Sequence, residues 1–450
     1  MTEFDSDEGQ GVTRRDFLKI GAGAAAGIML PSLWAPAALA AEKHQALGTY
    51  PAGVGRHSVF VGITVPLTGS YSASGKDLRR GYELAIEQIN AGHDIARRWG
   101  MHGKGVLGKQ IEYDVADSQT KPNPAVQAQT KFINQKKALM ITGSVSSATA
   151  IALEKLAQRE HVLNMVGASG SNDTTGKDCQ RYGFRSQPPA YMVAQGLAPV
   201  LAKEMGKQVK AAYLVPDYTY GHSVFDSVSK ATEALGWKTV SKQLVPLGTT
   251  DFSSALINIA NSGADVFVNV AFGNDAVASS KQAQQFGILK KMKLVVPNIS
   301  PFQYKEAGSD IMEGAYGTMD FWWGLEDRYP LAKDFVQAFE AKHNYKPRWT
   351  ANIGYMQTYI WALAVQRAGT FYPVSVIKEL ESGHKVDSTL GEVWYSDYDH
   401  QLVRPVPVVR GKSSAQMKGK EDYYEVVGVV SGEKAMVPKG TFGCELGPYT

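Results

Sequence analysis

Three short segments carry residue types that could do chemistry. Gly167-Ala168-Ser169-Gly170-Ser171 approaches the nucleophile elbow of a hydrolase, in which a serine on a sharp turn attacks an acyl group, but Ser171 stands where the second glycine belongs. Residues 103–108 spell the G-x-G-x-x-G of a dinucleotide site, yet these glycines precede a predicted strand at Ile111 instead of following one. The third segment, Asp397-Tyr398-Asp399-His400, has no glutamate at EF-hand spacing, so a hairpin turn is the better interpretation than a metal loop.

Composition excludes further classes of chemistry. The nine histidines form no i,i+3 or i,i+4 pair, and two cysteines cannot build a Cys₄ or Cys₂His₂ zinc module. The 450 residues include 47 Lys+Arg and 43 Asp+Glu, a balance that leaves no electrostatic footprint for DNA or RNA. We therefore expect no enzyme, no cofactor, no metal and no nucleic-acid partner.

The first 40 residues have the order of an export signal. Thr13-Arg14-Arg15-Asp16-Phe17-Leu18-Lys19 precedes an apolar run and a small-residue cleavage site, Ala38-Leu39-Ala40. The paired arginines resemble the twin-arginine (Tat) signal. A membrane anchor is the alternative, but the run has about 11 residues where a bilayer span needs about 20. Because no cysteine precedes Cys179 to carry a lipid, we expect a soluble periplasmic protein exported by the Tat translocase.

After the export signal, short strand-like runs alternate with longer helical patterns along the chain. Residues 59–64 are strand-like, and residues 76–90 place apolar side chains on one helical face. The alternation continues to residue 166, restarts after Ser186-Gln187-Pro188-Pro189, and gives a second unit of similar size. Alternating strands and helices predict parallel sheets covered on both faces. The fold class is therefore α/β with two lobes, and the tail from about residue 403 is predicted to lie extended across them.

Loops at the predicted strand ends carry motifs in the order of a known family. Gly62-Ile63-Thr64-Val65-Pro66-Leu67-Thr68-Gly69 resembles the leucine/isoleucine/valine-binding family of bacterial ABC-transporter solute receptors. Further matches follow in family order over roughly residues 57–400: Asp117-Ser118-Gln119, Gly143-Ser144-Val145-Ser146-Ser147, Tyr182-Gly183-Phe184-Arg185, Tyr220-Gly221 and Thr250-Asp251-Phe252-Ser253. The resemblance implies a type I periplasmic-binding-protein fold, in which two Rossmann-like lobes, joined by three crossings of the chain, close on a small ligand.

Aligning those crossings places them near residues 186, 318 and 392. The predicted domains are a signal peptide at 1–40, a first lobe of 57–186 plus 318–392, a second lobe of 187–317 plus 393–405, and a C-terminal extension of 406–450.

The resemblance also implies a ligand site. Ser147 opens a predicted helix and corresponds to the serine that holds the ligand carboxylate, where free N–H groups and the helix dipole favour an anion; a plain N-cap serine is the alternative. Ala168 and Ser169 match the loop that completes the carboxylate cradle, or else form an ordinary polar turn. Tyr220 matches the tyrosine that covers the ligand from the second lobe, with a packed surface tyrosine as the alternative. The other predicted ligand-binding residues are Tyr71, Ser74, Val145, Ser146, Phe272, Asn298 and Phe321.

Asn298 is the most informative departure from the family pattern. Amino-acid binders of the family place a glutamate there, which neutralises the ammonium of the ligand. Losing that anion should weaken an amino acid at least about tenfold, since a hydrogen bond to a charged group contributes about 1.5–3 kcal/mol and a buried unpaired charge costs more. Asp275 and Asp320 are possible substitutes. The aromatic run Phe321-Trp322-Trp323 adds possible contact surface, so a carboxylate without an α-amine, or an amide, is favoured.

These inferences predict a monomeric substrate-binding protein that delivers a small ligand to the permease of an ABC importer. A receptor of the same fold that signals to a partner protein is the alternative. The two cysteines, Cys179 and Cys444, could form a disulfide in an oxidising compartment and clamp the tail onto the first lobe. Two separate thiols are the other possibility.

Overall fold

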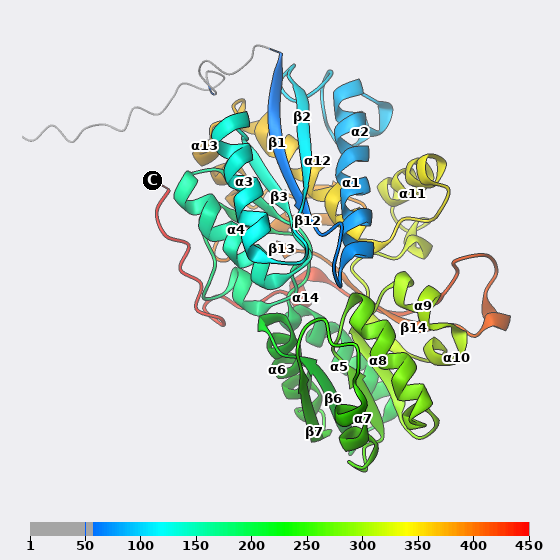
Figure 1. Ribbon diagram of the computed structural model, residues 1–450. Helices are drawn as coiled ribbons and strands as arrows, with labels where there is room; N and C mark the ends of the chain where they lie inside the picture. Colours follow the sequence, from blue (N-terminus) through cyan, green and yellow to red (C-terminus); the bar gives the residue numbers. More distant parts are fainter. Residues whose placement is uncertain (1–49, 51–56, 450) are drawn as a thin grey trace, which may run out of the picture. The chain divides into compact units, whose positions relative to one another are not determined.

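Two sheets organise the chain in the computed structural model, which describes residue 50 and residues 57–449 (Figure 1). The predicted signal at 1–40 lies outside the described residues. The first sheet has the order β2-β1-β3-β4-β5 with every neighbouring pair parallel. Its strands are β1 (Ser58–Val65), β2 (Gln110–Asp117), β3 (Met140–Gly143), β4 (Leu163–Val166) and β5 (Gly183–Arg185). β1, with the sequence SVFVGITV, is buried at every position after the first, as expected of a parallel strand covered on both faces.

Helices from two distant parts of the chain cover this first sheet. The early ones are α1 (Ser72–Ala91), α2 (Asp94–Arg98), α3 (Pro122–Lys136) and α4 (Ser147–Glu160). The later ones are α11 (Pro330–His343), α12 (Trp349–Ala368) and α13 (Pro373–Glu381). α1 packs along α12, and α12 is buried from Trp349 to Val365, so this helix is a core element with hardly any solvent face. We call the first sheet with these helices the first half.

The second sheet has seven strands in the order β15-β14-β10-β9-β8-β6-β7. The strands are β6 (Lys210–Pro216), β7 (Lys238–Val245), β8 (Val266–Asn269), β9 (Lys293–Asn298), β10 (Tyr316–Thr318), β14 (Val406–Gly411) and β15 (Tyr424–Val430). The five strands from β6 to β10 are parallel, whereas β14 and β15 are antiparallel to their neighbours. The helices of this second half are α5 (Ala190–Met205), α6 (Thr219–Glu233), α7 (Ser253–Ala260), α8 (Gly273–Gln285), α9 (Pro301–Ala307) and α10 (Ser309–Met312).

The C-terminal segment differs from the prediction of an extension that begins at residue 406. Residues 406–411 and 424–430 complete the second sheet as β14 and β15, because valines on these strands pack into the core while their backbones pair with β10 and with each other. Only the tail after Val430 leaves the sheet, through the short helix α14 (Gly432–Ala435).

Three connections join the halves. The first follows β5 at residues 186–189, and the second follows β10 at residues 319–329. The third lies at residues 404–405, later than the predicted crossing near 392. The cause is a small antiparallel sheet of β11 (Val386–Ser388), β12 (Gly391–Tyr395) and β13 (Leu402–Val403), which stays with the first half because Gln401 bridges to Arg185 at the edge strand β5.

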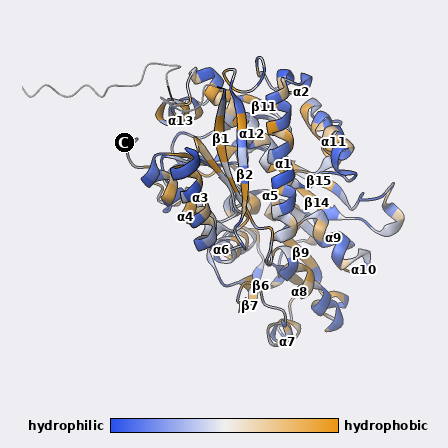
Figure 2. Ribbon diagram, turned by 45° about the horizontal axis from the view of Figure 1, so that its top comes forward, coloured by the Kyte–Doolittle hydropathy of each residue, from blue (hydrophilic) through white to orange (hydrophobic). Residues whose placement is uncertain are grey.

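Apolar residues lie mainly on the strands and on the inward helix faces, while polar residues cover the outward faces (Figure 2). Both halves are large enough for a core of their own. The carboxyl ends of the parallel strands in the two halves face each other, and the loops that follow them are therefore brought together.

Candidate ligand-binding site

A narrow cavity of about 280 Å³, its mouth included, lies where the two halves meet. Its walls come from the loops after β3 and β4 in the first half and after β6, β8 and β9 in the second, with one residue from the first connection and one from α12. The lining residues are Val145, Ser147, Ala168, Gly170, Gln187, Tyr218, Tyr220, Phe272, Asn298 and Trp349. None of these residues is charged at neutral pH.

The turn from β3 into α4 sets the polar end of the cavity. Gly143 has φ +117°, and a Cβ there would lie 2.0 Å from the Thr64 carbonyl oxygen, so only glycine lets β3 approach β1 this closely. Ser144 follows with φ 75°, a strained conformation held by a hydrogen bond from its hydroxyl to the Ser146 carbonyl at 2.8 Å. The chain then enters α4, whose first residue, Ser147, lines the cavity.

Ser147 is the first residue of α4 and is buried. The helical ladder begins with the Ala150 N–H donating to the Ser146 carbonyl, so the N–H groups of residues 147–149 lie outside it. The Ser147 Oγ accepts a hydrogen bond from the Ser171 N–H at 3.1 Å, which leaves the hydroxyl proton free to donate. Free N–H groups, a free O–H and the positive end of the helix dipole together favour an anion.

The loop after β4 is held in place by Arg185, whose side chain is fully buried. Its guanidinium donates to the carbonyl oxygens of Ser169 and Ser171, and to Gln401 on the far side at 2.7 Å. Gly170 lies between the two serines, and a Cβ there would come within 3.0 Å of the Tyr220 ring. The glycine therefore lets Tyr220 of the second half lie directly on this loop.

Tyr220 and Asn298 form a pair on the opposite wall. The Asn298 Nδ2 donates to the Tyr220 hydroxyl at 3.0 Å, and both side chains are buried. Burial raises the pKa of Tyr220, so the hydroxyl stays protonated, and its proton is free because the oxygen already accepts from Asn298. Asn298 thus supports a donor at the position where a glutamate would supply a negative charge.

Aromatic side chains make up most of the remaining wall. Phe272 has its ring centroid 5.6 Å from that of Trp349 and 5.3 Å from that of Tyr71. The hydroxyls of Tyr71 and Tyr218 are 2.7 Å apart and link the first half to the second. Rings on several sides of a narrow space suit a flat, apolar ligand body.

Further hydrogen bonds cross between the halves beside the cavity. The Asn172 side chain donates to the Ser227 hydroxyl at 2.9 Å, and the Thr219 hydroxyl donates to Asp173 at 2.8 Å. The Ser171 hydroxyl lies 2.9 Å from that of Ser223. The segment 171–173 of the first half therefore docks against α6 of the second through several polar contacts.

The predicted site residues divide into three groups. Six of them line the cavity: Val145, Ser147, Ala168, Tyr220, Phe272 and Asn298. Tyr71 stands behind Phe272 and Tyr218. The other four do not line it: Ser74, Ser146, Ser169 and Phe321.

Local packing explains why two of these four point elsewhere. The Ser169 hydroxyl bonds that of Thr174 at 2.8 Å, and Phe321 packs against Phe335 with ring centroids 5.6 Å apart. The acidic residues Asp275 and Asp320 are also outside the cavity lining. Asp275 accepts the Gly248 N–H at 2.7 Å within its own half and a hydrogen bond from the side chain of Ser70 in the other half.

Sequence reasoning missed Gln187, Tyr218 and Trp349. Gln187 follows directly on the predicted crossing near 186, and its position on a connection between lobes was a usable signal. Its side-chain oxygen is buried and has no hydrogen-bond partner in the described part of the chain. Tyr218 lies two residues before Tyr220, whereas nothing in the sequence ties Trp349 to a site far from it along the chain.

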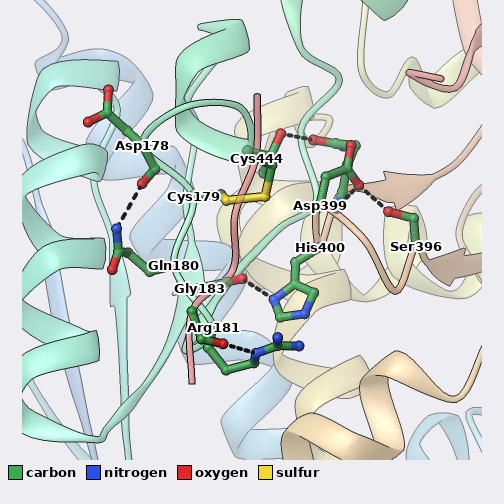
Figure 3. The surroundings of a disulfide bond; sticks show 12 residues. Asp178, Cys179, Gln180, Arg181, Gly183, Ser396, Asp399, His400 and Cys444 are labelled. Carbon is green, nitrogen blue, oxygen red and sulfur yellow. Dashed lines mark hydrogen bonds between the residues drawn. A yellow bond between two sulfur atoms is a disulfide. The ribbon is translucent and has the colours of Figure 1, made fainter. Parts of the chain in front are cut away.

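Cys179 and Cys444 form a disulfide that links the C-terminal tail to the segment before β5 (Figure 3). Nearby, His400 bonds the Gly183 carbonyl at 2.9 Å and stacks on Phe184 with ring centroids 3.9 Å apart. Within the described residues, no group of three or more His, Cys, Asp or Glu side chains is arranged to hold a metal ion. No helix in that part of the chain has the length and apolar character that a membrane span requires.

The two α/β halves meet over a cavity that is lined by strand-end loops of both. This arrangement defines the class of two-lobed ligand-binding proteins. The chain belongs to the periplasmic binding protein family, whose model matches residues 58–416. A twin-arginine translocation pathway signal sequence matches residues 11–31, which confirms the predicted export signal. The protein is thus a Tat-exported periplasmic binding protein.

Known proteins agree with this assignment. The chain is 26% identical over 300 residues to Leu/Ile/Val-binding protein homolog 8 of Brucella abortus, covering 64% of this chain and 70% of that protein. A periplasmic binding protein from Burkholderia mallei superposes with TM-score 0.79 at 24% identity, covering 87% of this chain and all of that one. A solute-binding protein of an R. palustris ABC transporter, solved with benzoate, gives TM-score 0.72 at 20% identity and covers 86% and 100% of the two chains. These likenesses agree with the periplasmic binding protein family and its fold, and they do not favour the signalling alternative.

Proposed function

We propose that this protein captures a small aromatic carboxylate without an α-amine, and releases it unchanged to the permease of an ABC importer. The observation that carries the proposal is the set of donors in the cavity. The oxygens of Ser147 and Tyr220 each accept an internal hydrogen bond, from the Ser171 N–H and the Asn298 amide, so both hydroxyl protons remain for a ligand. A site furnished with donors and lacking any lining carboxylate favours an anion over an ammonium.

The ligand body follows from the remaining walls. Phe272 and Trp349, together with the rings of Tyr218 and Tyr220, surround a narrow space. Aromatic walls favour a flat ring as the ligand body once the halves part to admit it, and the solved relative that holds benzoate is compatible with such a ligand. The unpartnered side-chain oxygen of Gln187 would accept a hydrogen bond from a second polar group of the ligand, such as a ring hydroxyl.

The two halves would open and close to admit the ligand. The cavity walls come from both halves, and polar contacts such as Asn172 to Ser227 join them around it, so a bound ligand is enclosed only while these contacts hold. The ligand and the hydrogen bonds between the halves would therefore stabilise the same closed arrangement. A permease that recognises this arrangement would then select the ligand-bound protein.

The test is a ligand screen by thermal shift and calorimetry with benzoate, the three hydroxybenzoates, aliphatic acids, amides and leucine. Benzoate or a hydroxybenzoate should bind at least about tenfold more tightly than leucine, because an ammonium would enter without a counter-charge. Gln187→Met should remove any preference for a hydroxybenzoate over benzoate. Binding of leucine at micromolar affinity or better would refute the ligand class, and chemical change in the recovered ligand would refute the binding role.

Ser147→Ala is expected to weaken carboxylate binding by about tenfold or more, because it removes a charge-assisted hydrogen bond. The matched control is Ser146→Ala, which alters the neighbouring hydroxyl outside the cavity lining and should leave affinity unchanged. Calorimetry of both variants with the tightest carboxylate from the screen measures the difference. Equal affinities for the two variants would remove Ser147 from the anion site.

A further inference from the structure

The C-terminal tail forms a fourth link between the halves. It leaves the second sheet at the end of β15, passes through α14, and reaches Cys179 of the first half at Cys444 (Figures 1 and 3). We call residues 431–444 the strap. Unlike the three backbone connections, the strap joins the halves covalently only when the disulfide is closed.

The start of the strap is seated on the connections between the halves. α14 packs against α5 and β13. Gly432 approaches the third connection so closely that a Cβ would lie 2.6 Å from the Arg404 backbone nitrogen. Further along, the Val437 carbonyl accepts a hydrogen bond from the Tyr398 hydroxyl at 2.5 Å. The first part of the strap is therefore held in place by contacts along most of its length.

The far end of the strap is fixed to the first half beyond the disulfide. The Arg181 Nε donates to the Gly447 carbonyl at 3.0 Å, and the Tyr182 hydroxyl donates to the Tyr449 carbonyl at 2.5 Å. The guanidinium of Arg181 also lies over the Tyr449 ring, 4.5 Å from its centroid. These contacts are local and partly exposed, so the disulfide is the strongest fixed point of the tail.

The strap passes the place where the halves dock. Phe442 lies against Gly176 of the first half and against Tyr191 at the start of α5, with ring centroids 5.9 Å apart. The Tyr191 N–H donates to the Asn172 side chain, which itself bonds Ser227 of α6. Opening the cavity must part the segment 171–173 from α6, and this motion carries the nearby Cys179 away from β15, where the strap begins.

We propose that the closed disulfide makes the strap a limiter of interlobe opening, and that reducing it widens the opening and speeds ligand release. This inference rests on the opening and closing proposed above. A covalent link of fixed length excludes the widest open arrangements, so it favours the closed one and lowers the conformational cost of ligand capture. The disulfide is then a regulatory element of the binding cycle as well as a crosslink.

The test uses the ligand-free protein, so that it does not depend on the identity of the ligand. Small-angle scattering and hydrogen exchange are recorded before and after reduction by a phosphine, which becomes its oxide with one water as the disulfide becomes two thiols. Reduction should raise the radius of gyration and speed exchange in residues 171–175 by about threefold or more. Thiol titration verifies that reduction is complete.

A second variant separates the effect of the length of the strap from the effect of the crosslink itself. A Gly/Ser insertion of about six residues between Lys439 and Gly440, in an exposed turn, keeps the disulfide and adds roughly 20 Å of reach. It should reproduce the wider opening without reduction. The same insertion after Gly419, in the exposed loop between β14 and β15, is the matched control and should change neither measurement.

Two results would overturn the limiter. One is unchanged scattering and exchange in the fully reduced protein. The other is an insertion after Lys439 that behaves like the control, which would leave the disulfide a purely stabilising bond. Failure of the carboxylate screen with a positive result here would instead refute the ligand class while the limiter stands.

Discussion

Replacing both cysteines by serine is expected to lower the free energy of unfolding by roughly 5 kcal/mol. The disulfide closes a loop of 265 residues in the unfolded chain, and the entropy that a crosslink removes from that state grows with the logarithm of loop length. Cys179 is also buried, with 4% of its surface exposed, so the folded state holds one end of the bridge rigidly. Urea unfolding of Cys179→Ser/Cys444→Ser against the oxidised parent measures the difference.

The reduced parent protein is the internal control for this prediction. It should unfold at the same urea concentration as the double serine variant, because both lack the same crosslink. The variant with the lengthened strap should keep most of the stability, since six extra residues change a loop of this size very little. If the free energy of unfolding fell by less than about 1 kcal/mol in the double variant, the disulfide would contribute little to stability. The non-covalent contacts of the tail would then be enough to restrict the unfolded chain or to stabilise the folded one.

The architecture was accessible from the sequence because each half repeats the same local pattern. β1 and α1 occupy residues 58–65 and 72–91, close to the runs at 59–64 and 76–90 that apolar spacing indicated. The strand-end loops carry the family motifs, and parallel strands bring such loops to one edge, so Ser147, Ala168 and Tyr220 were predictable as neighbours.

The parts that could not be predicted depend on long-range packing. Trp349 reaches the cavity because α12 packs along α1, and no local pattern encodes that pairing. Phe321 was expected at the ligand, but its ring packs against Phe335 instead. An aromatic run has the same appearance in the sequence whether it packs into the core or lines a cleft. The third connection lies at Arg404, later than predicted, because the small sheet before it includes two very short strands, β11 and β13, which carry too few residues for a recognisable period.

Arg404→Met is expected to destabilise the protein by about 3–5 kcal/mol at neutral pH, because it leaves a buried carboxylate without its main counter-charge. Arg404 is fully buried on the third connection. Its guanidinium donates to the Ser186 carbonyl of the first connection at 3.3 Å and to the Asp320 carbonyl of the second. One side chain therefore ties together all three backbone connections, and methionine can replace its length but not its charge.

The loss should depend on pH through Asp320. Burial raises the pKa of this carboxyl to about 6, although Arg404 and then Arg185 lower it. A group whose folded pKa lies above its unfolded value contributes stability that is present at low pH and is lost as the pH rises through the folded pKa. For Asp320 in the parent protein this amounts to about 3 kcal/mol in total, lost between the unfolded pKa of 3.8 and the folded pKa of about 6, and this pH window should widen when Arg404 is absent.

Unfolding of four proteins at pH 5 and pH 8 separates these effects: the parent, Arg404→Met, Asp320→Asn and the double variant. Arg404→Met should lose more stability at pH 8 than at pH 5, and adding Asp320→Asn should recover most of the difference because the uncompensated charge is gone. A loss that is equal at both pH values would assign the role of Arg404 to its hydrogen bonds with the Ser186 and Asp320 carbonyls. In that case the three connections would be held by backbone contacts, and the charge of Arg404 would have no part in positioning the two halves.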